Sequence, residues 1–274
     1  MKTTLLAFVL TGALCAQSAS NPSVDRARAI LLAGLGDKDP DVRVQALHGL
    51  GIVGRNEEMI KGLTDHLEDK DVKVRLAAVG AIVDLKDASF IPALQKRVTE
   101  DDVPEVAFAA AKALYGFKDP QGKTALNAMF NKEMKTDSSM IRSKVRDFVR
   151  TVKTPRSAML LAIRNGAGYI PLPGFGEGVG AAIDLMTDGD FSARANVVLL
   201  MVTERSDENK KIISSALTDK DWTVRAAGVQ SVAGLNWMEF FPQIESMLDD
   251  KKDKVRYRAA ATYLRLVSIK AKAN

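Results

Sequence analysis

The chain of 274 residues has little of what most catalytic and metal sites require. It contains one cysteine, Cys15, and two histidines, His48 and His66, which stand 18 residues apart without the spacing of metal ligands. We therefore expect no disulfide, no thiol chemistry, no metal site and no cofactor. Aromatic residues make up only 6% of the chain. The core is expected to consist of Ala, Val, Leu and Ile, without a large aromatic cavity.

Long hydrophobic runs are also absent, except at the N-terminus. There Lys2 precedes an apolar run from Leu5 to Ala16 and the small residues Ser18, Ala19 and Ser20. This pattern is typical of a secretory signal peptide, and its apolar part is too short to span a membrane. We predict that residues 1–20 are removed by cleavage between Ala16 and Ser20. The mature protein is then a bacterial, periplasmic or secreted protein without cysteine.

The residue before Cys15 and the net charge bear on lipid attachment and on possible partners. Lipid attachment at Cys15, the alternative to simple cleavage, would require a small residue before it, where Leu14 stands. The net charge of +5 is modest and the bases are interspersed with acids. A nucleic-acid partner is therefore not expected, although an anionic partner stays open.

What the chain does contain is an acidic motif that ends in Val-Arg and returns at a nearly fixed step. Clear copies occupy residues 37–43, 69–75, 219–225 and 250–256, and eroded copies occupy residues 102–107 and 188–194. With Val42 as the register, the equivalent residues are Val74, Val106, Ala193, Val224 and Val255, at steps of 32, 32, 87, 31 and 31 residues. A constant period of this size predicts a solenoid, in which each unit buries its apolar face against its neighbours.

The sequence of each unit predicts two helices. An Asp, followed by Pro40 or Pro104, is expected to cap and start the first helix, and Gly51 and Gly54 are expected to end it in the first unit. A second helix is expected from about Glu57 to Leu67. The motif of Asp, Val-Arg, Ala and Leu-Gly resembles the HEAT-repeat family, specifically the short variety named after phycobilin lyase subunits. The resemblance implies an all-α solenoid of about six to seven two-helix repeats.

The regular period fails in the middle of the chain. We expect HEAT-like repeats in residues 21–165 and 188–274, with residues 22–35 forming a helix that caps the N-terminal end of the stack. Residues 166–187 are expected to be an irregular apolar insertion rich in Gly and Pro, which forms a loop at one edge of the solenoid. The insertion fits neither a P-loop nor a dinucleotide-binding pattern.

Two sets of candidate site residues follow. The recurring arginines and aspartates are expected to form a structural network that links adjacent repeats, with a ligand-binding arginine ladder as the alternative: Asp39, Arg43, Asp71, Arg75, Asp190, Arg194, Asp221, Arg225, Asp253 and Arg256. Candidate interaction residues lie on a basic helix face and in the insertion: Arg142, Arg146, Arg150, Lys153, Tyr169, Ile170, Leu172 and Phe175. A solvated helix face and a loop packed onto its neighbours are the plainer explanations of the second set.

Three functions are consistent with these observations. The first is a non-enzymatic, extracytoplasmic scaffold that binds another protein of unknown identity. The second is a peripheral binder of anionic surfaces or membranes that uses the basic helix and the apolar loop. The third is an enzyme related to bilin lyases, which the export signal and the lack of a cysteine or histidine cluster disfavour. We expect the first.

Overall fold

The computed structural model describes residues 21–131 and 192–273. Within these ranges the chain forms α-helices and short 3-10 turns and no β-strand, so the expected all-α fold is confirmed. The helices of the N-terminal half are α1 (Pro22–Leu35), α2 (Pro40–Val53), α3 (Glu57–His66), α4 (Val72–Leu85), α5 (Ile91–Glu100), α6 (Pro104–Gly116) and α7 (Pro120–Phe130). Those of the C-terminal half are α11 (Ala193–Met201), α12 (Asp207–Leu217), α13 (Trp222–Leu235), α14 (Phe241–Ser246) and α15 (Asp253–Ala273).

The helix boundaries follow from local chemistry. Asp39, Asp71 and Asp221 each accept a hydrogen bond from the backbone N–H two residues on, which caps the helix that follows. Gly54 ends α2 with φ 88°, as expected, whereas Gly51 lies inside the helix. Helix α15 continues to Ala273, with the basic residues Lys270 and Lys272 in its last turn, where cations interact favourably with the helix dipole.

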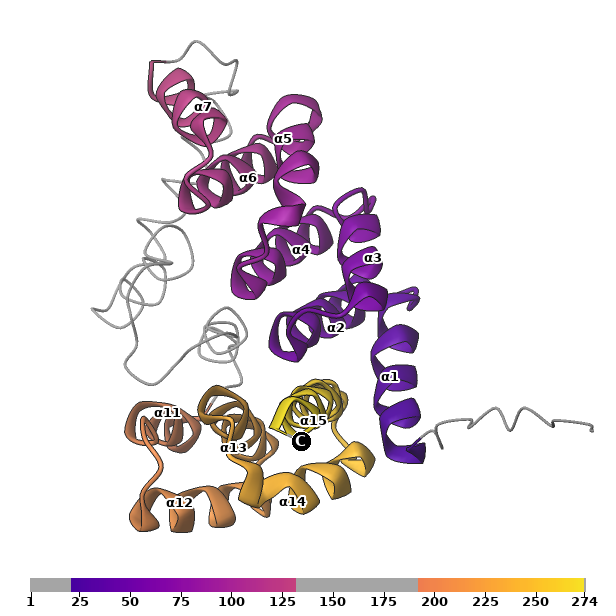
Figure 1. Ribbon diagram of the computed structural model, residues 1–274, viewed down its shortest axis with the longest axis vertical. Helices are drawn as coiled ribbons and strands as arrows, with labels where there is room; N and C mark the ends of the chain where they lie inside the picture. The colour runs from indigo at the N-terminus through magenta and orange to yellow at the C-terminus, as the bar shows by residue number, and fades with distance from the viewer. Residues whose placement is uncertain (1–20, 132–191, 274) are drawn as a thin grey trace, which may run out of the picture.

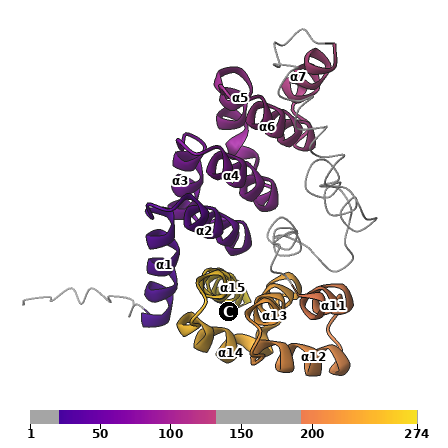
Figure 2. The same cartoon turned by 180° about the vertical axis from the view of Figure 1, so that it is seen from behind.

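The helices are arranged in two layers that curve together (Figures 1 and 2). The first layer runs in the order α11, α13, α15, α2, α4, α6, and it lines the inner side of the curve. The second layer runs α12, α14, α1, α3, α5, α7 on the outer side. Six two-helix units therefore stack within the described residues, which is the expected solenoid.

The order of the units in space differs from their order in the chain. Helix α15, the last, packs against α1 and α2, the first two, and against α13 on its other side. The expectation that residues 22–35 cap one end of the stack is therefore wrong. Helix α1 instead completes a central unit whose other helix is α15. It fits there because Ala27 and Leu31 are fully buried, which leaves no apolar side free at an end of the stack.

The register valine marks the face that each first-layer helix turns toward the preceding unit. Val74, Val106 and Val255 have no exposed surface, and Val224 is also buried. Ala193, at the same position in α11, is exposed because α11 begins the stack and no described unit precedes it. The neighbouring positions Val197, Leu200 and Met201 are half exposed for the same reason.

Candidate interaction surface

The recurring arginine binds two consecutive units together. In the first unit, Arg43 donates from Nη1 to the carbonyl oxygens of Asp37 and Lys38, at 2.9 and 3.1 Å. Its Nε and Nη2 donate to both carboxylate oxygens of Asp69 in the next unit, each at 2.9 Å. One guanidinium thus closes the turn of its own unit and holds the turn of the next.

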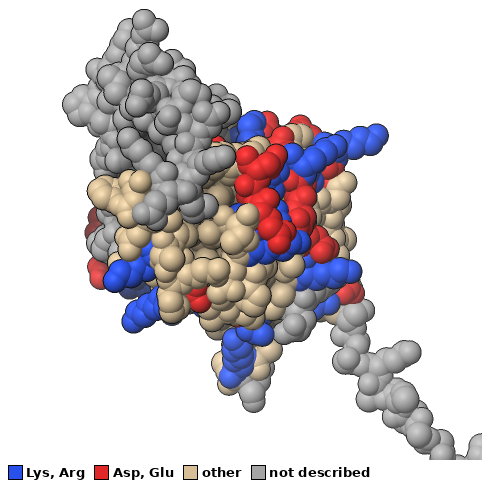
Figure 3. Space-filling view, turned by 90° about the horizontal axis from the view of Figure 1, so that it is seen from above, with Lys and Arg blue, Asp and Glu red and all other residues tan. Residues whose placement is uncertain are grey.

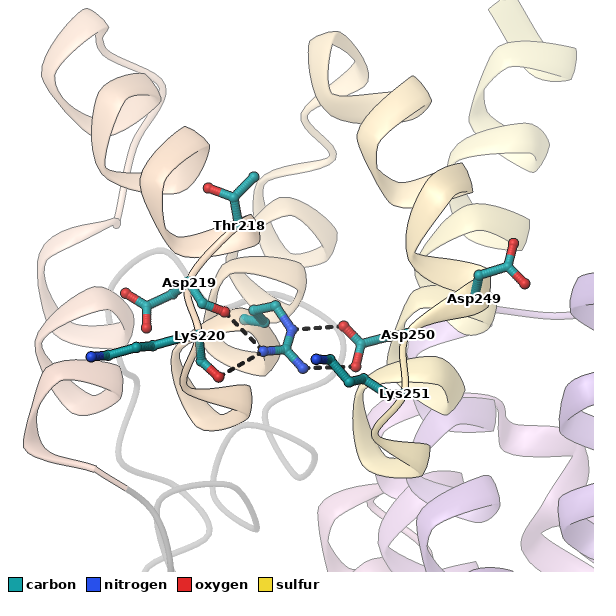
Figure 4. A pocket seen from close by; sticks show the side chains of 7 residues that line it. Thr218, Asp219, Lys220, Asp249, Asp250 and Lys251 are labelled. Carbon is teal, nitrogen blue, oxygen red and sulfur yellow. Dashed lines mark hydrogen bonds and ion pairs between the residues drawn. The ribbon is translucent and has the colours of Figure 1, made fainter.

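The same geometry recurs in the C-terminal half. Arg225 donates to the carbonyls of Asp219 and Lys220, at 2.8 and 3.2 Å, and to the two oxygens of Asp250, at 2.6 and 2.8 Å (Figure 4). Arg75 bridges the carbonyl of Asp69 and the carboxylate of Asp101, at 2.9 and 3.0 Å. Arg194, at the open end of the stack, pairs with Asp219 while remaining largely exposed.

Except at Arg256, the acidic partner of each arginine lies in the turn that begins the following unit, not at the second Asp of the arginine's own motif. Asp39, Asp71 and Asp221 serve as helix caps, while these arginines contact the carboxylates of Asp69, Asp101, Asp102, Asp219 and Asp250. Arg256 contacts the carbonyl of Asp250 at 2.7 Å and the carboxylate of Asp253 in its own unit. Asp190 lies outside the described residues.

These contacts shift the titration of the acids. Burial raises the pKa of Asp69, but the hydrogen bonds from Arg43 and from the Asp71 backbone N–H outweigh it and hold that pKa below its usual range. The pKa of Asp250 is lowered in the same way, against burial, by Arg225 and the backbone N–H of Lys252. Both acids are therefore ionised wherever the repeats are folded at neutral pH.

A pocket lies between the turns that carry this network. It is lined by Thr218, Asp219, Lys220, Arg225, Asp249, Asp250 and Lys251 (Figure 4). Four of the five N–H donors of Arg225 bind protein oxygens, so most of this guanidinium's hydrogen-bonding capacity is used within the protein. Along the surface, acidic and basic side chains gather together toward one side and are intermixed (Figure 3). The network is built to join repeats.

The inner face of the N-terminal half presents a different surface. Helix α4 is flanked by α2 and α6 and backed by the second layer, so only its inner side is left without a packing partner. Lys73, Gly80 and Val83 are exposed on that side, and Val83 is 43% exposed. On α6 the position equivalent to Val83 holds Tyr115, which is 59% exposed, and the position equivalent to the half-buried Leu76 holds Phe108, which is 44% exposed. Two aromatic rings thus stand exposed on α6.

The equivalent positions in the C-terminal half are closed. In α13 every residue from Thr223 to Ala233 is buried, including Ala226 and Ala233 where α6 has Phe108 and Tyr115. In α15 the corresponding Leu264 is 8% exposed. Tyr257, the equivalent of Phe108 in α15, is half-buried. Among the described first-layer helices, exposed side chains at these two positions occur on α4 and α6.

His66 and the two tryptophans make contacts that stabilise the fold. The ring nitrogens of His66 lie 2.7 Å from the carbonyl oxygen of Gly62 and 3.0 Å from that of Leu35, which ties α3 to the end of α1. Trp237 is buried and packs edge-on against Phe240. Trp222 lies under Lys252 and Lys254, whose Nζ atoms are 5.0 and 5.2 Å from the ring centre.

Two features are absent from residues 21–131 and 192–273. No group of three or more His, Cys, Asp or Glu side chains in these ranges has an arrangement that could hold a metal ion. None of the helices described there combines the length and the hydropathy that crossing a membrane requires.

The other candidate residues lie outside the described part of the chain. They are Arg142, Arg146, Arg150, Lys153, Tyr169, Ile170, Leu172 and Phe175, together with the predicted signal peptide in residues 1–20. Conversely, the periodicity did not single out Phe108 and Tyr115. The signal was present, because the second and ninth positions after the register valine hold Val44 and Gly51, Leu76 and Val83, and then two aromatic residues.

Comparison with known proteins supports the repeat assignment. Residues 60–143 match the family model described as HEAT repeats. No curated protein matches the chain. The match is to HEAT repeats in general, so the phycobilin-lyase variety stays a prediction. Residues 60–143 are therefore similar to HEAT repeats, and the stacked two-helix units agree with that likeness.

Proposed function

We propose that the protein is a non-enzymatic, extracytoplasmic scaffold that binds a partner protein on the inner face of α4 and α6. HEAT repeats generally serve as scaffolds for protein interaction. The observation that carries the proposal is the exposure of Phe108 and Tyr115 on a face where the equivalent residues of α13 are buried. Exposed aromatic side chains that point away from their own core are the usual anchors of protein interfaces.

The surroundings of these rings favour a protein segment over a small ligand. Neighbouring first-layer helices lie about 8–10 Å apart, so Val83 of α4 lies beside the level of Tyr115, and Phe108 lies two turns before Tyr115 on α6. This surface also carries charge, in the exposed ion pair between Lys73 and Asp41, at 3.0 Å. An apolar surface that also carries charge fits a helix or an extended segment that presents apolar side chains at intervals.

Site-specific photo-crosslinking tests this proposal. Benzoylphenylalanine replaces Tyr115, and the variant is expressed in the source cells or mixed with their extracytoplasmic extract before irradiation. We expect one saturable crosslinked partner, lost when Phe108→Ser is added. The control places the same group at Lys123, which is exposed on α7 of the second layer.

Two outcomes would contradict the proposal. The first is equal crosslinking from Tyr115 and Lys123, and the second is a partner that Phe108→Ser leaves unaffected. If the partner is lost only when residues 141–185 are deleted, the basic helix and the apolar insertion carry binding instead. Cell fractionation with the mature N-terminus sequenced tests the location, and a mature protein recovered from the cytoplasm with residues 1–20 intact would remove the extracytoplasmic part.

A further inference from the structure

The two halves of the stack meet at a junction that no peptide bond crosses. The N-terminal half ends at α7 and the C-terminal half begins at α11, at opposite ends of the stack, and residues 132–191 connect them in sequence. In space the halves are joined where α15 packs against α1 and α2. We call this contact the seam.

At two glycines of the seam, there is no room for a side chain larger than a hydrogen atom. A Cβ atom on Gly34 of α1 would lie 2.5 Å from the ring of Tyr257. On Gly49 of α2 it would lie 2.9 Å from Leu31 and 3.6 Å from the Cβ of Ala261. Gly80 of α4, by contrast, has nothing within 4 Å of that position. Gly34 is thus fitted to Tyr257 of α15, whereas the closest atom at Gly49 belongs to α1.

At the third position after the register valine, the seam carries a polar pair that the other described junctions between first-layer helices lack. Arg258 of α15, which is 1% exposed, donates from Nη1 to the side-chain oxygen of Gln45 on α2, at 3.0 Å. Arg265 donates to the carbonyl oxygen of Ile52 on α2, at 3.2 Å, and to the side chain of Asn236, at 2.7 Å. At the position of Gln45 and Arg258 the other first-layer helices have Ala77, Ala109, Asn196 and Ala227.

A buried guanidinium discriminates between neighbours. Stacked against any helix with alanine at that position, Arg258 would keep its hydrogen bond to the carbonyl of Lys254, at 3.0 Å, but would lose the one to the facing helix. Losing a buried hydrogen bond to a charged group weakens that alternative contact. The outer edge adds contacts from α1, where Arg26 pairs with Asp249 and Ser23 donates to Glu245. The face of α1 and α2 therefore recognises α15 by its side chains.

We propose that the seam is an exchangeable docking site, in which the face of α1 and α2 recognises α15 through the Arg258–Gln45 pair and accepts α15 from a second copy of this chain. Because both sides of the seam belong to one chain, closure within a molecule does not depend on protein concentration, whereas exchange between two copies does, so the closed monomer prevails in dilute solution. When the internal seam is blocked, two copies exchange their C-terminal halves.

The test is a swap of the polar pair in the full chain. Gln45→Arg places two guanidiniums against each other, and Arg258→Gln leaves two amides, so each single variant weakens its own seam. Both changes in one chain restore an arginine–glutamine pair. A mixture of the two single variants restores a matched pair at both seams only when the copies exchange halves.

We expect the double variant to be a monomer with nearly wild-type Tm. The mixed single variants, at tens of micromolar, should give a heterodimer by light scattering and native mass spectrometry. As a matched control, Gln121→Arg changes an exposed residue of α7 and should not dimerise with Arg258→Gln. If the single variants unfold alone, they are refolded together from denaturant and helicity is measured.

The proposal is overturned by either of two results. One is a double variant that recovers no more stability than the single variants, because the pair would then not determine recognition. The other is a mixture that shows neither a heterodimer nor joint recovery of helicity while the double variant folds. These outcomes are independent of any partner bound at Phe108 and Tyr115.

Discussion

Helices α4 and α13 hold equivalent places in their halves, begin after the same capping aspartate, and differ on one side only. In both, the residues of the register valine and the arginine network are buried. On the inner side, α4 exposes Gly80 and Val83, whereas α13 buries Gln230 and Ala233 at the same positions. The repeat motif thus fixes the faces that stack, and leaves the inner face free to differ between units and to carry a function.

The largest effect should be equal in the two halves. Val74→Asp and Val224→Asp each place a charge without a partner in a buried contact between units, and each should cost about 4 kcal/mol or more. Chemical denaturation of the two variants measures this. A variant with wild-type stability in either half would show that the register valine does not mark the stacking face there.

Lysine at two equivalent positions should lower the stability of the protein much more in α13 than in α4. Ala233→Lys inserts a long charged side chain where 1% of the residue is exposed, and it should cost about 3 kcal/mol. Val83→Lys, at the equivalent position, should change stability by less than about 0.5 kcal/mol because the side chain reaches solvent. Equal losses would mean that the inner face of α4 is closed in solution.

The arginine network should make both halves sensitive to acid. Because the folded state lowers the pKa of Asp69 and Asp250, their ionisation stabilises the fold above the unfolded pKa of about 4, and this contribution disappears as the pH falls through the folded pKa. Asp69→Asn and Asp250→Asn should each cost about 2 kcal/mol at pH 7. Each should also flatten the fall of Tm between about pH 5 and pH 2. An unchanged pH profile would argue against these pairs.

The smallest effect concerns two glycines. Gly80→Ala should stabilise the protein by up to about 1 kcal/mol, because alanine favours the helix and nothing lies within 4 Å of the new methyl group. At Gly228 of α13 the methyl group would lie 3.1 Å from Ala216 and 3.2 Å from Leu217, so crowding should cancel the gain. Thermal melts of the two variants compare them, and a larger gain at Gly228 would reverse the comparison.

The sequence predicts the helices well because the residues that start and end them act locally. Asp39, Pro40 and Gly54 fix the bounds of α2 wherever that helix lies in the stack. The order of units in space is not a local property, since a constant period states that units stack without stating which unit is central. Gln45 and Arg258 are the sequence signal for which units meet at the centre, because three other units have alanine at the same position.

The candidate site residues likewise fall into those that the sequence pattern predicts and those that only the fold reveals. The arginines recur at one position, so a network between repeats could be expected, whereas the acid that each arginine contacts depends on how far the next turn lies from it. Phe108 and Tyr115 could not be distinguished from core residues by period alone. Their exposure follows from the packing of α6 against its neighbours, which only the fold shows.

The inner face and the seam both depend on α15 lying beside α2, and a disulfide tests that most directly. The Cβ positions of Gly49 and Ala261 are 3.6 Å apart, within the range that a disulfide spans. In a Cys15→Ser chain, Gly49→Cys with Ala261→Cys should form an intramolecular disulfide on mild oxidation at low concentration and raise Tm. Gly80→Cys with Ala261→Cys should not. A pair that stays reduced, or that links only separate molecules, would contradict the arrangement.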